Sequence, residues 1–152
     1  MDEKEDRVSK NLTILNNMGC MFSIILMSEN MLSHSIADAN SLLRQILSEA
    51  NIHDYSKQKF GPDYKIEIST EYLAYKPFEK GLSTLYRASS RGDCRIWFGP
   101  FTRKYVSPDD KLAIFAINNK LYLLNLSQYN INRALTSDFE NPIKQFLTHY
   151  FE

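Results

Sequence analysis

The sequence predicts an α+β, β-rich domain, a pseudobarrel of about seven strands with two helices. Most of its apolar segments are short and bounded by Gly, Pro, Asn or Ser, and several alternate with a period of two, as half-buried strands do. Only two stretches carry apolar residues at helical spacing. A chain of 152 residues has the length of one domain, and we expect residues 19–152 to form it.

Residues 1–18 are expected to form a charged, partly flexible arm, because the chain opens Met-Asp-Glu-Lys-Glu-Asp. A secretory signal would begin with basic rather than acidic residues. The longest apolar run, 20–27, is eight residues long, whereas a membrane span needs about 20. The sequence therefore predicts a cytoplasmic protein with no membrane partner.

The first half of the predicted domain contains one strand, one helix and the beginning of a sheet. Residues 19–27 are short and apolar and are expected to form a buried strand. A helix is expected at 35–50, with Ser35 as its N-cap, Asp38 at its third position and a one-sided apolar face. After a polar loop, apolar and polar residues alternate at 64–69, which predicts a half-buried strand.

The second half is richer in strands, which are predicted at 82–88, 94–98, 112–117 and 121–126. Asn118 and Asn119 join the last two, because Asn tolerates the positive φ of a tight hairpin. A turn with Pro108 at its second position precedes them. Asn141 as N-cap and Pro142 at the first helical position begin the second helix.

The net charge of the chain is zero, but the charge is unevenly distributed. Its 18 Lys and Arg balance 18 Asp and Glu. Between residues 80 and 105, six basic residues accompany one acidic residue, so this segment carries +5 and the remainder carries −5. A basic segment on an otherwise acidic body favours a polyanionic partner for one face of the protein.

The segment around residues 87–98 carries the candidate nucleic-acid site. On a strand, Arg91, Asp93 and Arg95 would share one face, with Trp97 on the same face by parity. Arg can read guanine bidentately in the major groove, and an acid can accept from cytosine or hold an Arg in position. A simpler alternative is that the two arginines pair with the acid on a solvated face.

Other residues of the basic segment are suited to the DNA backbone. Serine hydroxyls and glycine allow a close approach to phosphate, and further cations follow the Gly-Pro turn. Phosphate contacts are therefore expected from Arg87, Ser89, Ser90, Arg103 and Lys104.

The unit Cys94-Arg95-Ile96-Trp97-Phe98-Gly99, followed by Pro108-Asp109-Asp110 and a hydrophobic strand pair, resembles the effector-binding half of type IIE restriction endonucleases of the EcoRII kind. That half has a DNA-binding pseudobarrel fold, which it shares with plant B-three transcription-factor domains. The resemblance implies that Arg91, Asp93 and Arg95 lie on one of two arms that embrace the major groove.

The other arm of that family follows an early strand and often carries Ser-x-Asn, which Ser28-Glu29-Asn30 resembles. Ser28 and Asn30 are therefore expected to hold phosphates or the opposite side of the groove. The implied function is sequence-specific double-stranded DNA binding, as the recognition domain of, or related to, a type II restriction endonuclease. No catalytic group or cofactor is then expected in this chain, and a nuclease domain or subunit is a candidate partner besides DNA.

Two other function classes stay open. Asp63, Asp109 and Lys111 match the pattern of a magnesium-dependent nuclease, in which carboxylates hold Mg²⁺ and a lysine positions water, although the turn preferences of Pro and Asp explain the pattern more simply. A protein-interaction module would use the aromatic residues of the C-terminal helix, whose simpler role is packing on the barrel. These residues are Phe146, Tyr150 and Phe151.

Metal and histidine chemistry find little support. Cys20 and Cys94 have no second Cys or His at metal-ligand spacing, so we expect no zinc site. The histidines lie far apart in the sequence, and none is expected to be catalytic.

Overall fold

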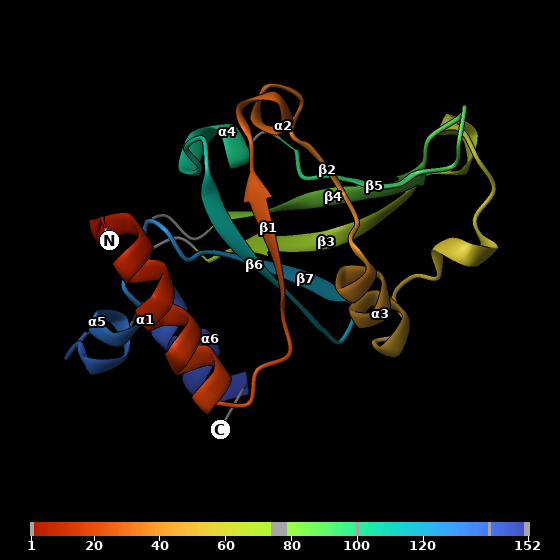
Figure 1. Ribbon diagram of the computed structural model, residues 1–152. Helices are drawn as coiled ribbons and strands as arrows, with labels where there is room; N and C mark the ends of the chain where they lie inside the picture. The colour runs from red at the N-terminus through yellow and green to blue at the C-terminus, as the bar shows by residue number, and fades with distance from the viewer. Residues whose placement is uncertain (1, 74–78, 100, 140, 151–152) are drawn as a thin grey trace.

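Seven strands form one nearly closed, barrel-like sheet in the order β1-β6-β7-β3-β4-β5-β2, as the computed structural model shows (Figure 1). All neighbouring strands are antiparallel except β3 and β7, which are parallel. The structure describes residues 2–73, 79–99, 101–139 and 141–150. The α+β class and the seven-stranded pseudobarrel predicted from the sequence are confirmed. The strands are β1 (Ser23–Met27), β2 (Ile36–Asp38), β3 (Ile66–Tyr72), β4 (Glu79–Arg87), β5 (Cys94–Trp97), β6 (Asp110–Ile117) and β7 (Lys120–Asn125).

The described residues contain six α-helices, where the sequence predicts two. The two predicted helices correspond to α3 and α6, and Asn141 caps α6 as expected, its Oδ1 accepting from the Lys144 N–H at 2.8 Å. Three of the others have only five or six residues, too few for a periodic apolar face to be visible in the sequence. The helices are α1 (Glu3–Asn17), α2 (Glu29–His34), α3 (Ser41–Glu49), α4 (Phe101–Tyr105), α5 (Ile131–Thr136) and α6 (Pro142–Tyr150), with 3-10 turns η1 (Tyr55–Lys57) and η2 (Pro62–Tyr64).

The helix predicted at 35–50 begins six residues later than expected. Ser35 is not an N-cap but the left-handed C-cap of α2, with φ of 56°. The next three residues form β2, in which Ala37 is buried and Asp38 exposed. Pairing with β5 satisfies this backbone, and the apparent helical spacing of Ile36 and Ala39 belongs to a strand and the residue that follows it.

The predicted flexible arm is replaced by α1, which packs against the barrel. Asp2 caps it by accepting from the Glu5 N–H at 2.8 Å. Val8 and Leu15 are buried, and so is Asn11, whose amide donates to the carbonyls of residues 126 and 129 at 2.8 and 2.7 Å. The Asn11 Oδ1 also accepts from the Ile131 N–H at 3.0 Å. The few buried positions lie among charged residues, so the sequence shows no clear apolar face that would predict this helix.

Asn40 fastens the open side of the barrel. Strands β1 and β2 are the two edges of the sheet, yet they follow each other in the chain, with α2 between them. The Asn40 Oδ1 caps α3 by accepting from the Leu43 N–H at 2.8 Å, and it also accepts from the Ser23 hydroxyl at 2.8 Å. Its Nδ2 donates to the Ile24 carbonyl at 3.2 Å. The chain after β2 is therefore bonded directly to β1.

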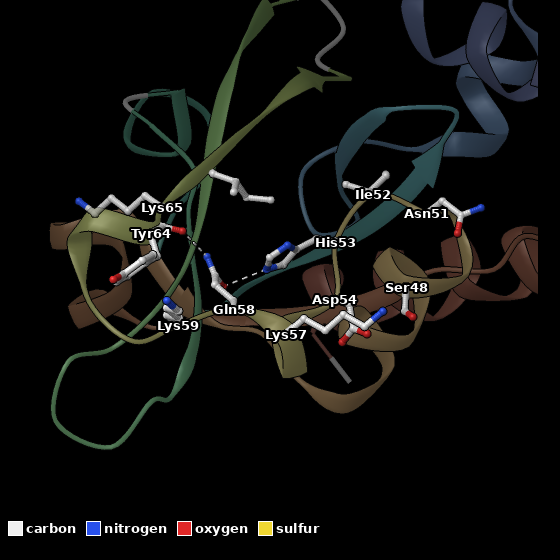
Figure 2. A pocket seen from close by; sticks show the side chains of 11 residues that line it. Ser48, Asn51, Ile52, His53, Asp54, Lys57, Gln58, Lys59, Tyr64 and Lys65 are labelled. Atoms are coloured by element: carbon white, nitrogen blue, oxygen red, sulfur yellow. Dashed lines mark hydrogen bonds between the residues drawn. The ribbon is translucent and has the colours of Figure 1, made fainter.

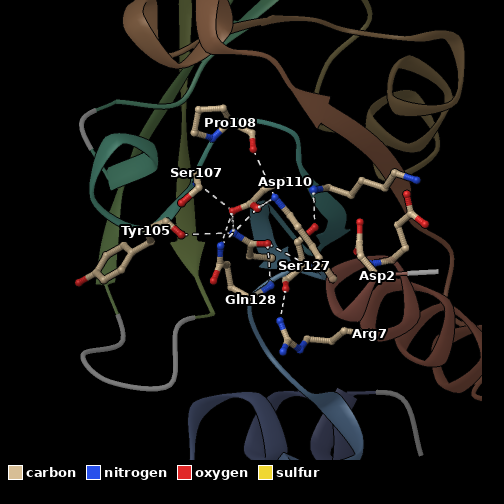
Figure 3. A network of polar contacts seen from close by, with 12 residues as sticks. Asp2, Arg7, Tyr105, Ser107, Pro108, Asp110, Ser127 and Gln128 are labelled. Carbon is tan, nitrogen blue, oxygen red and sulfur yellow. Dashed lines mark hydrogen bonds and ion pairs between the residues drawn. The ribbon is translucent and has the colours of Figure 1, made fainter.

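A buried carboxylate connects α1 to the sheet (Figure 3). Asp110, at the beginning of β6, is fully buried, forms an ion pair with Lys4 and accepts from the Ser107 N–H at 2.8 Å. The amides of Asn125 and Gln128 donate to its Oδ2 at 2.9 and 3.1 Å. Burial by itself pushes the pKa of Asp110 upward, but these donors together outweigh it and hold the pKa below its usual value.

Because the pKa of Asp110 is lower in the folded state, its contribution to stability is complete above the unfolded pKa of about 4 and is lost as the pH falls through the folded pKa. We expect Asp110→Ala to lower the free energy of unfolding at pH 7 by about 2–4 kcal/mol, since buried donors lose their acceptor. Asp110→Asn should flatten the acid limb of the stability curve. Urea unfolding between pH 6 and 3 measures both effects, with the exposed Asp109→Asn as control. Parallel curves for wild type and Asp110→Asn would contradict the assignment.

Candidate nucleic-acid interface

Two sequence segments predicted to contact DNA line one hollow. Ser28 and Asn30 come from the beginning of α2, and Arg95 comes from β5, more than 60 residues later. The hollow measures about 440 Å³, and its wall is completed by Met31, His34, Ile36, Ala37 and Asp38. It exists because α2 leads directly into β2, and β2 pairs with β5 so that Asp38 lies opposite Arg95. We call it the α2–β5 hollow.

Within the hollow, the two α2 residues differ in what they have to offer. The Ser28 hydroxyl is occupied as the N-cap of α2, where it accepts from the Met31 N–H at 3.2 Å. The Asn30 side chain is exposed, and its amide has no hydrogen-bond partner within the described residues. Asn30 is therefore the α2 side chain with free donors and an acceptor.

Arg95 points outward and is held loosely by two carboxylates. As the parity of the strand predicts, Trp97 is 37% exposed, whereas Ile96 and Phe98 are fully buried. The Arg95 guanidinium lies 3.6 Å from Asp93 Oδ2 and 3.8 Å from Asp38 Oδ1. Partly exposed pairs of this kind contribute about 0–1 kcal/mol, so Arg95 can exchange them for another acceptor.

Arg91 lies at the tip of the β4–β5 turn and not on a strand. The Gly92 N–H donates to the Ala88 carbonyl at 2.8 Å, and Gly92 has φ of 72°. The expectation that Arg91 and Arg95 share a strand face is therefore wrong, because this left-handed residue interrupts the alternation. Arg91 is exposed and has no side-chain hydrogen bond or ion pair within the described residues; Ser89 and Ser90 are exposed beside it.

Arg87 supports this turn from beneath. Its Nε donates to the Gly92 carbonyl at 2.7 Å, and Nη1 donates to the Tyr55 carbonyl at 3.4 Å. Its Cζ lies 4.4 Å from the centre of the Phe60 ring, and the Gly61 N–H donates to its backbone carbonyl at 2.9 Å. The side chain expected at a phosphate thus fastens the β4–β5 turn to the loop before β3.

The cations that follow the Gly-Pro turn lie on α4, beside α2. The Arg103 Nη2 donates to the Ser33 carbonyl at 2.9 Å, which ties the two short helices together. Lys104 is exposed, with its Nζ 5.3 Å from the centre of the Tyr105 ring. In Figure 1, α2 with α4 and the β4–β5 turn rise on the same side of the sheet, at the two ends of the β2–β5 pair.

The +5 segment does not form a single patch. Lys80 lies at the opposite end of β4 from the turn, where its Nζ is 3.7 Å from the buried carboxylate of Glu71. Lys120 reaches the same carboxylate at 3.4 Å. The charge sum along the sequence therefore overstates the positive charge of the interface by including a cation that neutralises a buried acid.

The two carboxylates of the nuclease pattern belong to two separate turns, and Lys111 lies in β6. Asp63 lies in η2, which contacts β4. Asp109 is the third residue of a turn that begins at Ser107, and its φ is 68°. The Asp109 N–H donates to the Met27 carbonyl at 2.7 Å. Within the described ranges, no three Asp, Glu, His or Cys side chains are grouped so that they could hold a metal ion.

The C-terminal helix packs on the sheet through Phe146. This side chain is 3% exposed, and its ring centre lies 5.8 Å from that of Phe115 and 4.4 Å from that of Tyr122. Packing on the barrel, the simpler expectation, is confirmed for this residue. The Tyr150 side chain and Phe151 lie outside the described residues.

Two lysines stacked on tyrosine rings, beside a pocket, were not predicted from the sequence. Lys59 and Lys65 lie over the rings of Tyr64 and Tyr86, with Nζ-to-centre distances of 5.4 and 5.6 Å. Both lysines border a pocket in the polar loop that precedes β3. The cluster of three lysines and one tyrosine within residues 57–65 is the signal that could have revealed it.

No helix in the described part of the chain has both the length and the apolarity needed to cross a membrane. No protein-family model, curated protein or solved structure matches the chain.

Gly92→Ala should distort the β4–β5 turn, because the added Cβ would clash with the Phe60 ring and alanine is strained at the φ of 72° found at this position. The expected cost is about 1–3 kcal/mol of the free energy of unfolding. Phe60→Ala removes the clash, so the double variant should be more stable than the sum of the single effects by about 1 kcal/mol. Urea unfolding of the four proteins gives this coupling, and strictly additive costs would show that the ring does not restrain the turn.

Proposed function

We propose that the chain binds double-stranded DNA sequence-specifically through the major groove, as the recognition domain of, or related to, a type II restriction endonuclease. The observation that supports this most is the α2–β5 hollow, where Ser28 and Asn30 meet Arg95. These residues were selected from separate parts of the sequence for the same function. Their convergence on one hollow supports a shared binding face.

The two projections divide the task. At the β4–β5 turn, Arg91 has its guanidinium free within the described residues and can donate bidentately to guanine. At the other end, the free amide of Asn30 suits adenine, which pairs bidentately with Asn, and Arg95 lies between them. A major groove about 12 Å wide admits such projecting elements. Asp93 orients Arg95 in the free protein and can accept from cytosine in the complex.

Contacts to the DNA backbone would surround these base contacts. Arg103 and Lys104 on α4 provide cations at the α2 end, and the Ser89 and Ser90 hydroxyls provide donors at the turn. The acidic remainder of the chain repels phosphates and thereby favours this face over the others. Recognition alone is assigned to the chain, so cleavage would need a nuclease domain or subunit as a partner.

Selection from random duplexes, followed by fluorescence anisotropy over a range of salt concentrations, tests the proposal. Arg91→Ala and Arg95→Ala should each cost about 1–3 kcal/mol for the preferred sequence and relax specificity at one position. Lys104→Ala should weaken all sequences alike and reduce the salt slope by about 1.

The matched control is Arg133→Ala, which removes an exposed arginine from α5 and should leave binding unchanged. Absence of binding of the wild type to random duplex DNA at moderate salt would overturn the proposal. A loss with Arg133→Ala as large as that with Arg91→Ala would do the same.

A further inference from the structure

Another pocket lies at the loop that precedes β3, with a lining unlike that of the DNA interface (Figure 2). It measures about 700 Å³, within the range of about 300–1,000 Å³ typical of small-molecule sites. Its wall comes from the end of α3, the loop itself and the first residues of β3. We call it the loop pocket, and its polar lining includes His53, Asp54, Lys57, Lys59, Tyr64 and Lys65.

The charge of the loop pocket is unbalanced. It contains three lysines, none of which forms a salt bridge within the described residues. The one acidic side chain, Asp54, is already engaged, because its Oδ1 accepts from the Ser56 N–H at 3.0 Å and from the Ser56 hydroxyl at 2.6 Å. Lys59 and Lys65 lie on the same side of the pocket as Tyr64, whereas Lys57 extends away from them (Figure 2). The Lys59 and Lys65 cations favour an anionic ligand such as a phosphate group.

His53 supplies a hydrogen-bond acceptor in the same pocket. The Gln58 Nε2 donates to the carbonyls of Tyr64 and Leu85 at 2.9 and 3.0 Å, so its Oε1 faces the His53 Nε2 at 2.9 Å. The His53 Nε2 must therefore carry a hydrogen, and Nδ1 is the acceptor of the neutral ring. Burial lowers the pKa of His53, more than the Gln58 hydrogen bond and Asp54 raise it, so the ring is neutral at pH 7. Its Nδ1 has no partner within the described residues.

The pocket also offers a surface for a flat ring. Tyr64 is 46% exposed, and Ile52 and Ile66 are half-buried on the pocket wall. An exposed tyrosine ring stacks favourably on another aromatic ring. The pocket thus combines cations, an acceptor for an N–H or O–H donor, and a flat apolar surface.

We propose that the loop pocket binds a nucleoside monophosphate unit, with its phosphate at Lys59 and Lys65 and its base against Tyr64. The unit can come from a free mononucleotide or from a nucleotide of a single strand, which have the same chemistry. The site is separate from the α2–β5 hollow and does not depend on duplex recognition.

Isothermal titration of the full-length chain with a free deoxynucleoside monophosphate tests the first source, and a short single-stranded oligonucleotide tests the second. Saturable binding is expected for at least one of them. The corresponding nucleoside and inorganic phosphate should each bind at least tenfold more weakly than the mononucleotide, because each lacks half of the proposed contacts. Amide chemical-shift changes should be centred on the loop between α3 and β3.

The double variant Lys59→Ala/Lys65→Ala should weaken binding at least tenfold, and Tyr64→Ala should weaken the nucleotide but not inorganic phosphate. The matched control is Lys10→Ala/Lys111→Ala, which removes two exposed lysines elsewhere and should bind as the wild type does. All substituted side chains are exposed, and thermal melting verifies folding.

No saturable binding of either probe by the wild type would overturn the proposal, and so would an equal loss in the control. These titrations contain no duplex, so their outcome is distinct from that of the duplex-binding assay.

Discussion

Asn40 bonds the chain just after edge strand β2 to β1, the opposite edge of the sheet, and so helps to close the barrel. Strands β1 and β2 lie at opposite ends of the sheet order but are separated by only one short helix in the chain. Since β1 is bonded to the residue that caps α3, the chain has to pass from β1 to β2 within a few residues, and α2 makes this connection. Helix α2 therefore lies at one end of the β2–β5 pair, and the hollow with Arg95 forms there. The candidate interface is thus a consequence of how the sheet closes.

The sequence predicts those elements whose pattern is local. Period-two alternation predicts most of β3, and short apolar runs on either side of a polar turn predict most of β4 and β5. The Asn118-Asn119 pair predicts the β6–β7 hairpin, and Asn118 has the expected positive φ, 56°. Elements that depend on distant partners were missed. Strand β2 has three residues and exists only because β5 pairs with it. Helix α1 depends on contacts of Asn11 with residues more than 100 positions away.

The candidate site was predicted in part, for the same reason. The family resemblance points to Asn30, and residue type with the expected strand face points to Arg91 and Arg95. All three side chains are at least partly exposed. Their relative placement could not be predicted, because it depends on β2 and on the left-handed conformation at Gly92. A charge sum along the chain counts Lys80 and Arg91 equally. Lys80 pairs with the buried acid Glu71, whereas Arg91 has no ion pair within the described residues. The lysines of the loop pocket lie outside the basic segment 80–105, so the charge distribution along the sequence does not point to them.

The loop before β3 lines the loop pocket on one side and contacts the β4–β5 turn on the other. Gln58 faces His53 in the pocket while it holds the Leu85 carbonyl of β4, and Phe60 lies under Gly92 of the β4–β5 turn. A ligand that stiffens this loop therefore restricts the conformations open to Arg91. Thermodynamic linkage makes any such effect reciprocal, so that a duplex held by the turn would alter the affinity of the pocket by the same factor. The loop would in this way couple the loop pocket to the β4–β5 turn, because a ligand bound at either one lowers the conformational entropy of the other.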